Sequence, residues 1–411
     1  MKAIELFSGA GGLTLGISRA GFCPEAIVEK NDDAMNTLLM NRRNGDHISK
    51  SSKLHKIDVR DFRYDSLDGS VILLAGGPPC QPFSQAGKHR GDRDERNMFP
   101  EILRAVRELE PKLFLIENVG GLVRKTFSDY FDYILLSLSF PLIAPCSDES
   151  WRDHRRRLLT LQKEGRMLEA SYEVQHKVLN AADYGVPQKR ERLFIVGTHR
   201  DLNLNWSFPS PSHSLDRLIW DQWVTREYWR RHGFSKSSTP EPPKAISRRV
   251  ERLLKSGEPL TLAWRTVRDA LLGLPSPQRR LTTSSIPNHQ FYPGARSYRG
   301  HTGSTLDFPA KTLKAGDHGV PGGENMLALP DGGVRYFTIR ECARLQTFPD
   351  DYVFSGQWCA SVRQVGNAVP VDFAFSVADS LAQTLKLHPK TRVGRDLKSA
   401  ATAESKNVMK K

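Results

Sequence analysis

The chain has 411 residues, of which 39% are hydrophobic, 26% charged and 9% aromatic, a composition that excludes an intrinsically disordered or collagen-like protein. Its 60 Lys and Arg against 46 Asp and Glu give a net charge of +14, which favours a polyanionic partner such as nucleic acid. No apolar run reaches the about 18 residues of a membrane span, and the N-terminus lacks a secretory signal, so we expect a cytoplasmic protein without a membrane anchor.

The first two hundred residues alternate short apolar runs with helical patterns. Five runs are predicted to be strands: Ala3 to Phe7, Ala26 to Glu29, Leu54 to Val59, Val71 to Ala75 and Leu113 to Glu117. A helix is predicted from Glu101 to Leu109, where apolar residues recur on one face, and Pro111 ends it. Strands that alternate with helices predict a doubly wound, Rossmann-like α/β sheet, whose ligands bind beyond the carboxyl ends of the strands.

The character of the chain changes at about residue 201. Residues 201–335 hold 13 of the 25 prolines and five of the seven tryptophans, which predicts a second, smaller, loop-rich domain. Regular patterns return at 336–386, where Thr338 and Glu341 have the spacing of a capping box and a helix is predicted from Val371 to about Leu385. This segment is expected to complete the domain formed by residues 1–200. Residues 387–411 are basic and polar, which predicts a disordered tail.

A glycine-rich turn follows the first predicted strand, from Phe7 through Gly9 and Gly11. Glycines there allow a sharp turn and let a ligand approach main-chain N–H groups at a helix N-terminus. The third glycine of the dinucleotide fingerprint is missing. Glu29 and Asp58 end the next two predicted strands, where carboxylates suit a nucleoside without a diphosphate. A tight turn that binds no ligand is the alternative.

Cys80 follows two glycines and two prolines at the end of the fourth predicted strand. The prolines fix the backbone and hold the thiol rigidly at the ligand edge of the sheet. A hydrophilic loop from Gln81 to Asn97 follows and is a candidate lid. The five cysteines form no CxxC motif or His/Cys cluster, so neither a disulfide framework nor a metal site is predicted. A buried, inert thiol is the alternative reading.

Three further charged residues adjoin apolar runs. Glu117 ends the fifth predicted strand, where an ionised carboxylate is costly unless it is paired, so either its pKa is raised or a substrate partner satisfies it. Arg190 and Arg192, two positions apart, would point to the same side of a strand and donate to base or phosphate oxygens. An ion pair at a strand end and a solvated edge strand are the alternatives.

Taken together, these segments resemble those of the cytosine-C5 DNA methyltransferase family. The resemblance covers residues 1 to about 200 and 335 to about 385, and six motifs occur in the order of the family. The motifs are FSGAGG at Phe7, GGPPCQPFS around Cys80, ENV at Glu117, QKRERLF at Gln188, RECARLQTFP at Arg340 and QVGNAVP at Gln364. Single motifs arise by chance, but six in order are highly specific.

The resemblance implies S-adenosyl-L-methionine as methyl donor and a cytosine flipped out of duplex DNA as acceptor. It implies that Cys80 is the nucleophile at C6, that Glu117 bonds N3, and that Arg192, supported by Arg190, holds O2. The cofactor residues implied are Phe7, Gly9, Gly11, Glu29, Asp58, Pro79, Asn367 and Val369. Lys30 stands where some members carry an aromatic residue that packs on adenine.

The resemblance also assigns residues 201–335 to a target recognition domain. The basic residues that could contact phosphates or guanine there include Arg248, Arg249, Arg279, Arg280, Arg296, Arg299, Lys311 and Lys314. The expected partner is double-stranded DNA, bound by a monomer that pairs functionally with a restriction endonuclease.

The nearest alternative is a tRNA cytosine-5 methyltransferase of the same fold, which the long proline-rich insert disfavours. A nucleic-acid-binding protein that has lost catalysis is disfavoured by the presence of Cys80, Glu117 and Arg192. A nicotinamide-dependent oxidoreductase is disfavoured by the incomplete glycine fingerprint and the Pro-Pro-Cys turn.

Overall fold

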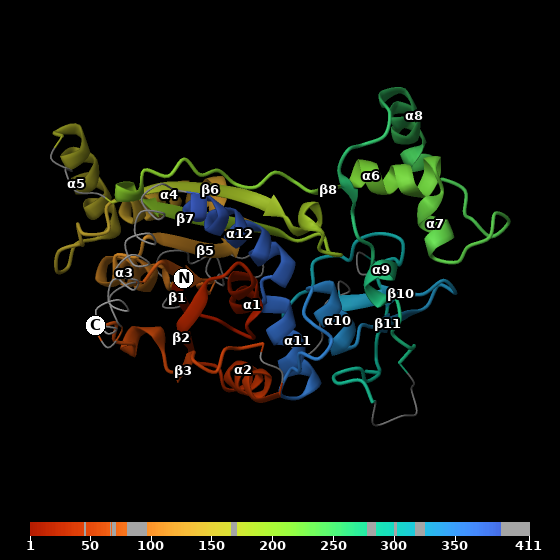
Figure 1. Ribbon diagram of the computed structural model, residues 1–411, viewed down its shortest axis with the longest axis horizontal. Coiled ribbons are helices and arrows are strands. Elements are labelled where there is room, and N and C mark those ends of the chain that lie inside the picture. The colour runs from red at the N-terminus through yellow and green to blue at the C-terminus, as the bar shows by residue number, and fades with distance from the viewer. Residues whose placement is uncertain are drawn as a thin grey trace, which may run out of the picture.

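The computed structural model describes residues 1–44, 47–65, 67, 71–79, 97–165, 171–277, 285–299, 302–316 and 325–387. A seven-stranded sheet lies at the centre of the molecule (Figure 1). Its strands are β1 (Lys2–Leu6), β2 (Cys23–Glu29), β3 (Lys53–Lys56), β4 (Leu73–Gly76), β5 (Leu113–Val119), β6 (Tyr172–Asn180) and β7 (Glu191–His199). The order is β3-β2-β1-β4-β5-β7-β6. The first five strands pair in parallel, and β7 runs antiparallel to both of its neighbours.

The predicted α/β class and the five predicted strands are confirmed, with their ends shifted by a few residues. The largest difference is in the third strand, which was predicted to run from Leu54 to Val59. Because β3 ends at Lys56, Asp58 lies beyond the strand rather than at its end. Arg192 does not lie on an edge strand, because β7 is enclosed by β5 and β6, and Arg190 precedes β7 by one residue.

Both faces of the sheet are covered because its buried strands are apolar on both sides. On β1, Ala3 faces α1 (Gly12–Arg19) and α12 (Val371–Leu387), and Ile4 faces α3 (Phe99–Leu109) and α4 (Ser128–Ser139). A Cβ on Gly16 of α1 would lie 2.4 Å from the Cβ of Ala374, so α1 and α12 are in close contact. The N-terminal and C-terminal parts of the chain therefore share one core (Figure 1).

A further core lies beside the sheet and joins α2 (Asp32–Asn44) to α10 (Ile339–Leu345) and α11 (Trp358–Asn367). Tyr352, which is fully buried, donates a 2.7 Å hydrogen bond to the carbonyl oxygen of Ala10 in the glycine turn. The C-terminal segment thus supports the turn that follows β1.

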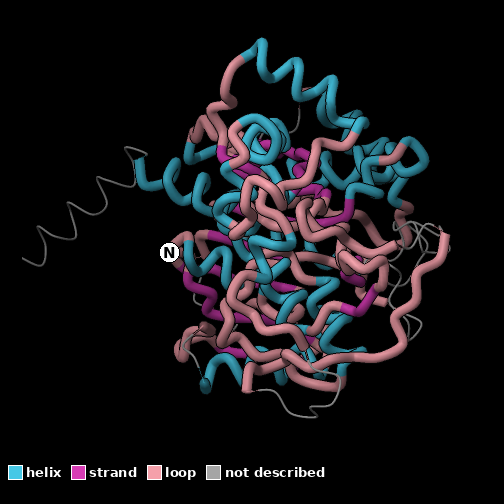
Figure 2. The backbone as a smooth tube through the Cα atoms, turned by 90° about the vertical axis from the view of Figure 1, so that its right-hand side faces the viewer, coloured by secondary structure: helices cyan, strands magenta, loops and turns pink. Residues whose placement is uncertain are grey.

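Between β7 and α10 the elements are short, as the proline content predicts. They are β8 (His213–Ser214), α6 (Leu215–Ile219), α7 (Glu227–Arg231), α8 (Ser247–Ser256), β9 (Leu262–Ala263), α9 (Val267–Leu271), β10 (Met326–Ala328) and β11 (Val334–Tyr336). Helices α6 to α8 lie apart from the sheet, at the opposite end of the molecule from α5 (Trp151–Lys163) (Figure 1). Figure 2 views the molecule from this end and shows how much of it is loop.

The segment between β7 and α10 packs into more than one core. Trp206 belongs to the core beneath α12, and Leu313 to the core around α10 and α11, whereas Tyr228 and Trp264 form a small cluster with α6 and α7. Helix α12 continues to Leu387, two residues beyond its predicted end, and the predicted tail from 388 on lies outside the described residues. Among the residues described, no helix is both long and apolar enough to span a membrane.

Candidate active site

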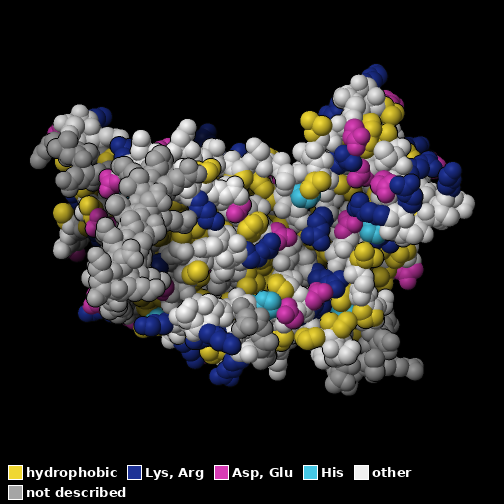
Figure 3. Space-filling model, in the orientation of Figure 1, with side chains coloured by type: hydrophobic (Ala, Val, Ile, Leu, Met, Phe, Trp, Pro, Cys, Tyr) yellow, Lys and Arg dark blue, Asp and Glu magenta, His cyan; other side chains and the backbone are white. Residues whose placement is uncertain are grey.

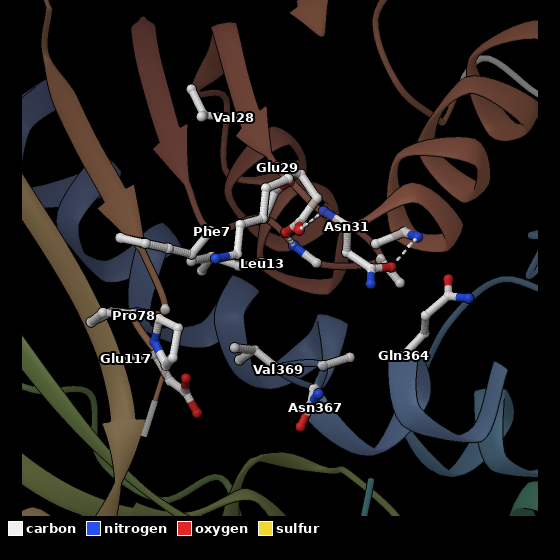
Figure 4. Close-up of a pocket in the computed structure, with 18 of the residues that line it drawn as sticks. Phe7, Leu13, Val28, Glu29, Asn31, Pro78, Glu117, Gln364, Asn367 and Val369 are labelled. Carbon is white, nitrogen blue, oxygen red and sulfur yellow. Dashed lines mark hydrogen bonds between the residues drawn. The ribbon is translucent and has the colours of Figure 1, made fainter. Parts of the chain in front are cut away.

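A cavity of about 450 Å³ opens at the carboxyl ends of β1, β2, β4 and β5 (Figure 4). This is the edge of the sheet at which the alternation of strands and helices places a ligand. The predicted site residues that line the cavity are Phe7, Gly9, Glu29, Asp58, Pro79, Glu117, Arg192, Asn367 and Val369. Residues from both ends of the chain therefore form one site, although more than 300 positions separate Phe7 from Asn367.

The glycine turn has the backbone conformation that its sequence predicts. Gly9 and Gly11 have φ angles of 55° and 85°, in the left-handed region that favours glycine. Gly11 is not among the residues that line the cavity. A Cβ on Gly11 would lie 2.8 Å from the hydroxyl oxygen of Tyr352, which means that this glycine lets the C-terminal segment pack against the turn.

The Glu29 carboxylate is fixed by main-chain N–H groups. Gly9 N donates to Glu29 Oε2 at 2.8 Å, and Asn31 N donates to Oε1 at 2.7 Å. Figure 4 shows Glu29 beside Phe7 and Asn31 at the wall of the cavity. Each carboxylate oxygen has a second lone pair, so Glu29 can still accept hydrogen bonds from a pair of ligand hydroxyls.

Asp58 is held by cations. Its carboxylate receives a fork of two hydrogen bonds from Arg60, at 3.0 and 2.8 Å, and lies 3.2 Å from Lys30 Nζ. These bonds, first of all those from Arg60, keep the pKa of Asp58 well below its usual range. A ligand amine that bonds Asp58 must therefore share it with two cations.

Glu117 and Arg192 form an ion pair in the wall of the cavity. Arg192 lies opposite Val119 in the antiparallel pair of β5 and β7, which brings its Nε to 2.9 Å from Glu117 Oε1. Both side chains are only about a tenth exposed. Burial raises the pKa of Glu117, although Arg192 and then Arg190 oppose this effect. The pair with Arg192 matches the alternative reading of Glu117, an ion pair at a strand end.

The two prolines before Cys80 lie next to this ion pair. Asn118 donates from Nδ2 to the carbonyl oxygen of Pro78 at 3.2 Å and is itself buried. Asn118 was not among the predicted site residues, although it directly follows Glu117 in the same motif. Cys80 and most of the predicted lid lie outside the described residues.

Arg190 occupies a different place from the one predicted. It lies one residue before β7 begins, so it does not share the face that presents Arg192 to the cavity. Its fully buried guanidinium donates to the carbonyl oxygens of Leu313, Gly366 and Ala368. The structure therefore corrects the prediction that Arg190 and Arg192 share one strand face: the Arg190 side chain binds main-chain carbonyl groups.

Sequence reasoning also missed one wall of the cavity. It is formed by Asp33 and Ala34 at the start of α2 and by Ala360, Arg363 and Gln364 on α11. On α11 these residues and Asn367 follow the spacing i, i+3, i+4, i+7, which marks one helix face and was the available signal.

Comparisons with known proteins agree with the motifs. The family model of the C-5 cytosine-specific DNA methylase matches residues 1–140 and 151–383, which confirms the family resemblance. Type II methyltransferase M.FnuDI of Fusobacterium nucleatum is 32% identical over 401 residues, covering 94% of this chain and 95% of the relative. Type II methyltransferase M.MthTI of Methanothermobacter thermautotrophicus is 30% identical, covering 94% and 98%.

The fold has relatives among solved structures. The S. pombe Dnmt2 methyltransferase superposes with a TM-score of 0.52 at 17% sequence identity, covering 94% of this chain and 98% of that one. At this identity the likeness concerns the fold alone.

Proposed function

The chain belongs to the C-5 cytosine-specific DNA methylase family and is a DNA cytosine-5 methyltransferase. From this premise we propose that it transfers a methyl group from S-adenosyl-L-methionine to C5 of a cytosine flipped out of a specific duplex sequence. The observation that carries the proposal is the buried Glu117–Arg192 pair, which lies in the same cavity as the Glu29-bound glycine turn and the Pro78-Pro79 approach to Cys80.

The cavity fits the proposed donor. Its volume is in the range of small-molecule sites, and it combines apolar walls with a few convergent polar groups. We assign the ribose hydroxyls to Glu29 and the adenine amino group to Asp58, with Lys30 beside it in place of an aromatic side chain. The other residues assigned to the donor are Phe7, Gly9, Pro79, Asn367 and Val369, with Gly11 in support. S-adenosyl-L-methionine would supply an electrophilic methyl group, whose bond to sulfur breaks as the bond to C5 forms, and S-adenosylhomocysteine would be the leaving group.

The protein side chains activate the acceptor. C5 of cytosine is a weak nucleophile, so the thiolate of Cys80 adds to C6 and moves the electron pair of the C5–C6 double bond toward C5. Glu117 hydrogen-bonds or protonates N3, which draws electron density from C6. General-acid assistance of this kind is typically worth about 10²- to 10⁴-fold.

Arg192 binds Glu117 through Nε, and its guanidinium has further N–H donors for the cytosine O2. Once C5 has formed its bond to the methyl group, the C5 proton leaves to a base. The double bond then re-forms, and the Cys80 thiolate departs from C6. Arg190 acts on this site from outside it, through the backbone carbonyls that it holds.

A flipped cytosine implies a duplex partner and a surface that holds it. We assign this role to residues 201–335, where Arg248, Arg296, Arg299, Lys311 and Lys314 are exposed. Arg249 instead donates to Asp216 at 2.6 Å, and Arg279 and Arg280 lie outside the described residues. Figure 3 shows Lys and Arg side chains over the lobe that carries α6 to α8, interspersed with Asp and Glu.

The relatives are named as type II methyltransferases, so we propose that this protein modifies DNA within a restriction-modification system, as a monomer paired in function with an endonuclease. Because the proposed substrate is cellular DNA and the relatives are type II methyltransferases, we assign the activity to the cytoplasm.

The test is transfer of a tritiated methyl group to duplex DNA and to tRNA, side by side, followed by bisulfite sequencing of the DNA. We expect label in DNA, at C5 of cytosine in one sequence context. Label in tRNA alone would instead identify a tRNA methyltransferase.

Cys80→Ser tests the covalent step, and Cys146→Ser, which alters an exposed cysteine, is its control. Cys80→Ser should abolish transfer and leave duplex binding intact, whereas Cys146→Ser should be as active as the wild type. Transfer by Cys80→Ser at the wild-type rate, or failure of DNA with 5-fluorocytosine to become trapped on the protein, would refute the mechanism.

A further inference from the structure

Arg190 joins the donor side of the cavity to the segment that carries Lys311 and Lys314. Its Nη1 donates to the carbonyl oxygen of Leu313 at 2.9 Å, and its Nη2 donates to those of Gly366 and Ala368 at 2.6 and 3.1 Å. Gly366 and Ala368 flank Asn367, and all three line the cavity. One planar guanidinium thus fixes the two stretches of main chain relative to each other.

A second buried bridge runs beside the first. Gln188 accepts a 2.9 Å hydrogen bond from Leu313 N and donates at 3.0 Å to Gln346 Oε1. Gln346 in turn donates to the carbonyl oxygens of Val365, at 2.6 Å, and Ala368, at 3.3 Å. Gln188, Arg190 and Gln346 are each fully buried, so water does not replace a bond that is lost.

The same two stretches are in direct backbone contact. A Cβ on Gly366 would lie 2.5 Å from Ala315 N and 2.5 Å from the carbonyl carbon of Lys314. Asn325 holds Lys314 from the other side, because it accepts from Lys314 N at 2.9 Å and donates to its carbonyl oxygen at 2.7 Å. The end of α11 and residues 313–315 therefore pack without room for a side chain at Gly366.

We propose that the network of Arg190, Gln188 and Gln346 couples the donor pocket to the Lys311–Lys314 segment, so that S-adenosyl-L-methionine and duplex DNA bind cooperatively. The inference rests on the proposed function for the identity of the two ligands. Its physical basis is that the main-chain groups bonded by these side chains in both stretches are paired in one arrangement, and moving either stretch alone leaves a buried carbonyl or N–H unpaired. Arg190 is in this view a positioning residue.

The coupling is measured as the ratio of the DNA dissociation constants without and with saturating S-adenosylhomocysteine, from fluorescence anisotropy of a labelled duplex. The duplex carries the site found by bisulfite sequencing, or sheared genomic DNA replaces it if no site is found. Couplings of this kind are typically about 5- to 150-fold. Arg190→Lys, which keeps the charge but not the planar fork, should bring the ratio to within about twofold of one.

Arg340→Lys is the matched control. Arg340 is also fully buried and also donates to three carbonyl oxygens, those of Pro287, Pro349 and Tyr352, but it contacts neither residues 313–315 nor 365–368 through these bonds. It should lower the melting temperature and leave the ratio unchanged, which separates coupling from a general loss of stability.

A wild-type ratio of one, or an Arg190→Lys ratio equal to that of the wild type, would overturn the inference. If Arg190→Lys does not fold, Gln346→Met removes the second bridge and should lower the ratio by at least about fivefold. A Gln346→Met ratio equal to that of the wild type would also overturn the inference. Methylation with a ratio of one would refute only the coupling. Coupled binding without methylation would refute only the proposed function.

Discussion

Two buried carboxyl groups lie near the cavity, and they differ in the charges around them. Glu117 faces Arg192, whereas Glu5 is fully buried in β1 below the glycine turn. Burial raises the pKa of Glu5 to about 8, the nearby polar groups of Thr14 oppose this, and the charge of Glu29 adds to it. At neutral pH the folded protein therefore holds Glu5 in its protonated form.

The raised pKa of Glu5 predicts a pH dependence of stability. Between about pH 4.5 and 8 the folded state binds a proton that the unfolded state releases, so the free energy of unfolding falls as pH rises and levels off above about 8. Glu5→Gln keeps a neutral side chain and should remove this decline. Urea unfolding of both proteins from about pH 5 to 9 measures the difference.

Glu173→Gln is the control for this comparison, because Glu173 is exposed on β6. Its stability should follow that of the wild type across the whole pH range. If Glu5→Gln also runs parallel to the wild type, Glu5 is ionised in the folded protein and the assignment is wrong.

Helix α10 shows which elements could be predicted from sequence. The spacing of Thr338 and Glu341 predicts a capping box, and both of its bonds are present, from Glu341 N to Thr338 Oγ1 at 3.1 Å and from Thr338 N to Glu341 Oε2 at 2.8 Å. The five strands were predictable for a similar reason, because a run of apolar residues is a local pattern. Local patterns determine these elements, and tertiary packing changes only their ends.

Because of this cap, we expect the Thr338 hydroxyl group to contribute to the free energy of unfolding. Thr338 also hydrogen-bonds the buried His289 through Oγ1, at 2.9 Å from Nδ1. Thr338→Ala should lower the free energy of unfolding by about 1–2 kcal/mol, in the upper part of the range for N-caps. Thr338→Ser keeps the hydroxyl and should recover most of the loss. Urea unfolding measures the stability of both variants, and the dependence of the free energy of unfolding on urea concentration should not change. Equal stabilities of the Ala and Ser variants would show that the cap contributes nothing.

Arg190 shows what could not be predicted. Its alternation with Arg192 assumes that both lie on a strand, but residues 188 and 189 instead pair with Ala310, and β7 begins only at Glu191. Its acceptors are 123 to 178 positions away, at Leu313, Gly366 and Ala368. Hydrogen bonds over such separations leave no periodic signal, and the same is true of the α2 and α11 wall of the cavity.

Across the whole molecule, the cavity depends on both ends of the chain. The first helix, α1, packs against the last, α12, and Arg19 donates to Asp372 at 2.6 Å where they meet. Because Tyr352, Asn367 and Val369 reach the cavity or its glycine turn only through this arrangement, residues 336–387 are part of the site. The segment between β7 and this stretch lies between two parts of the chain that share a core, and we call it the insertion.

The proposed DNA-binding role of the insertion predicts how salt affects duplex affinity. Cations on DNA release condensed counterions, so log K for a duplex falls linearly with log salt, by about 0.9 for each phosphate neutralised. Lys311 and Lys314 are exposed beside the cavity-linked stretch 313–315. If each contacts a phosphate, Lys311→Gln and Lys314→Gln should each reduce the slope by about one and weaken binding to all sequences alike.

Lys163→Gln is the control for the salt titration, because Lys163 is exposed on α5, at the opposite end of the molecule from α6 to α8 (Figure 1). Its slope should equal that of the wild type. A weaker dependence only in the Lys311 and Lys314 variants would locate the duplex on the insertion. Equal slopes in all four proteins would place the phosphate contacts elsewhere, and the net charge of +14 would then describe a solvated surface rather than a DNA-binding one.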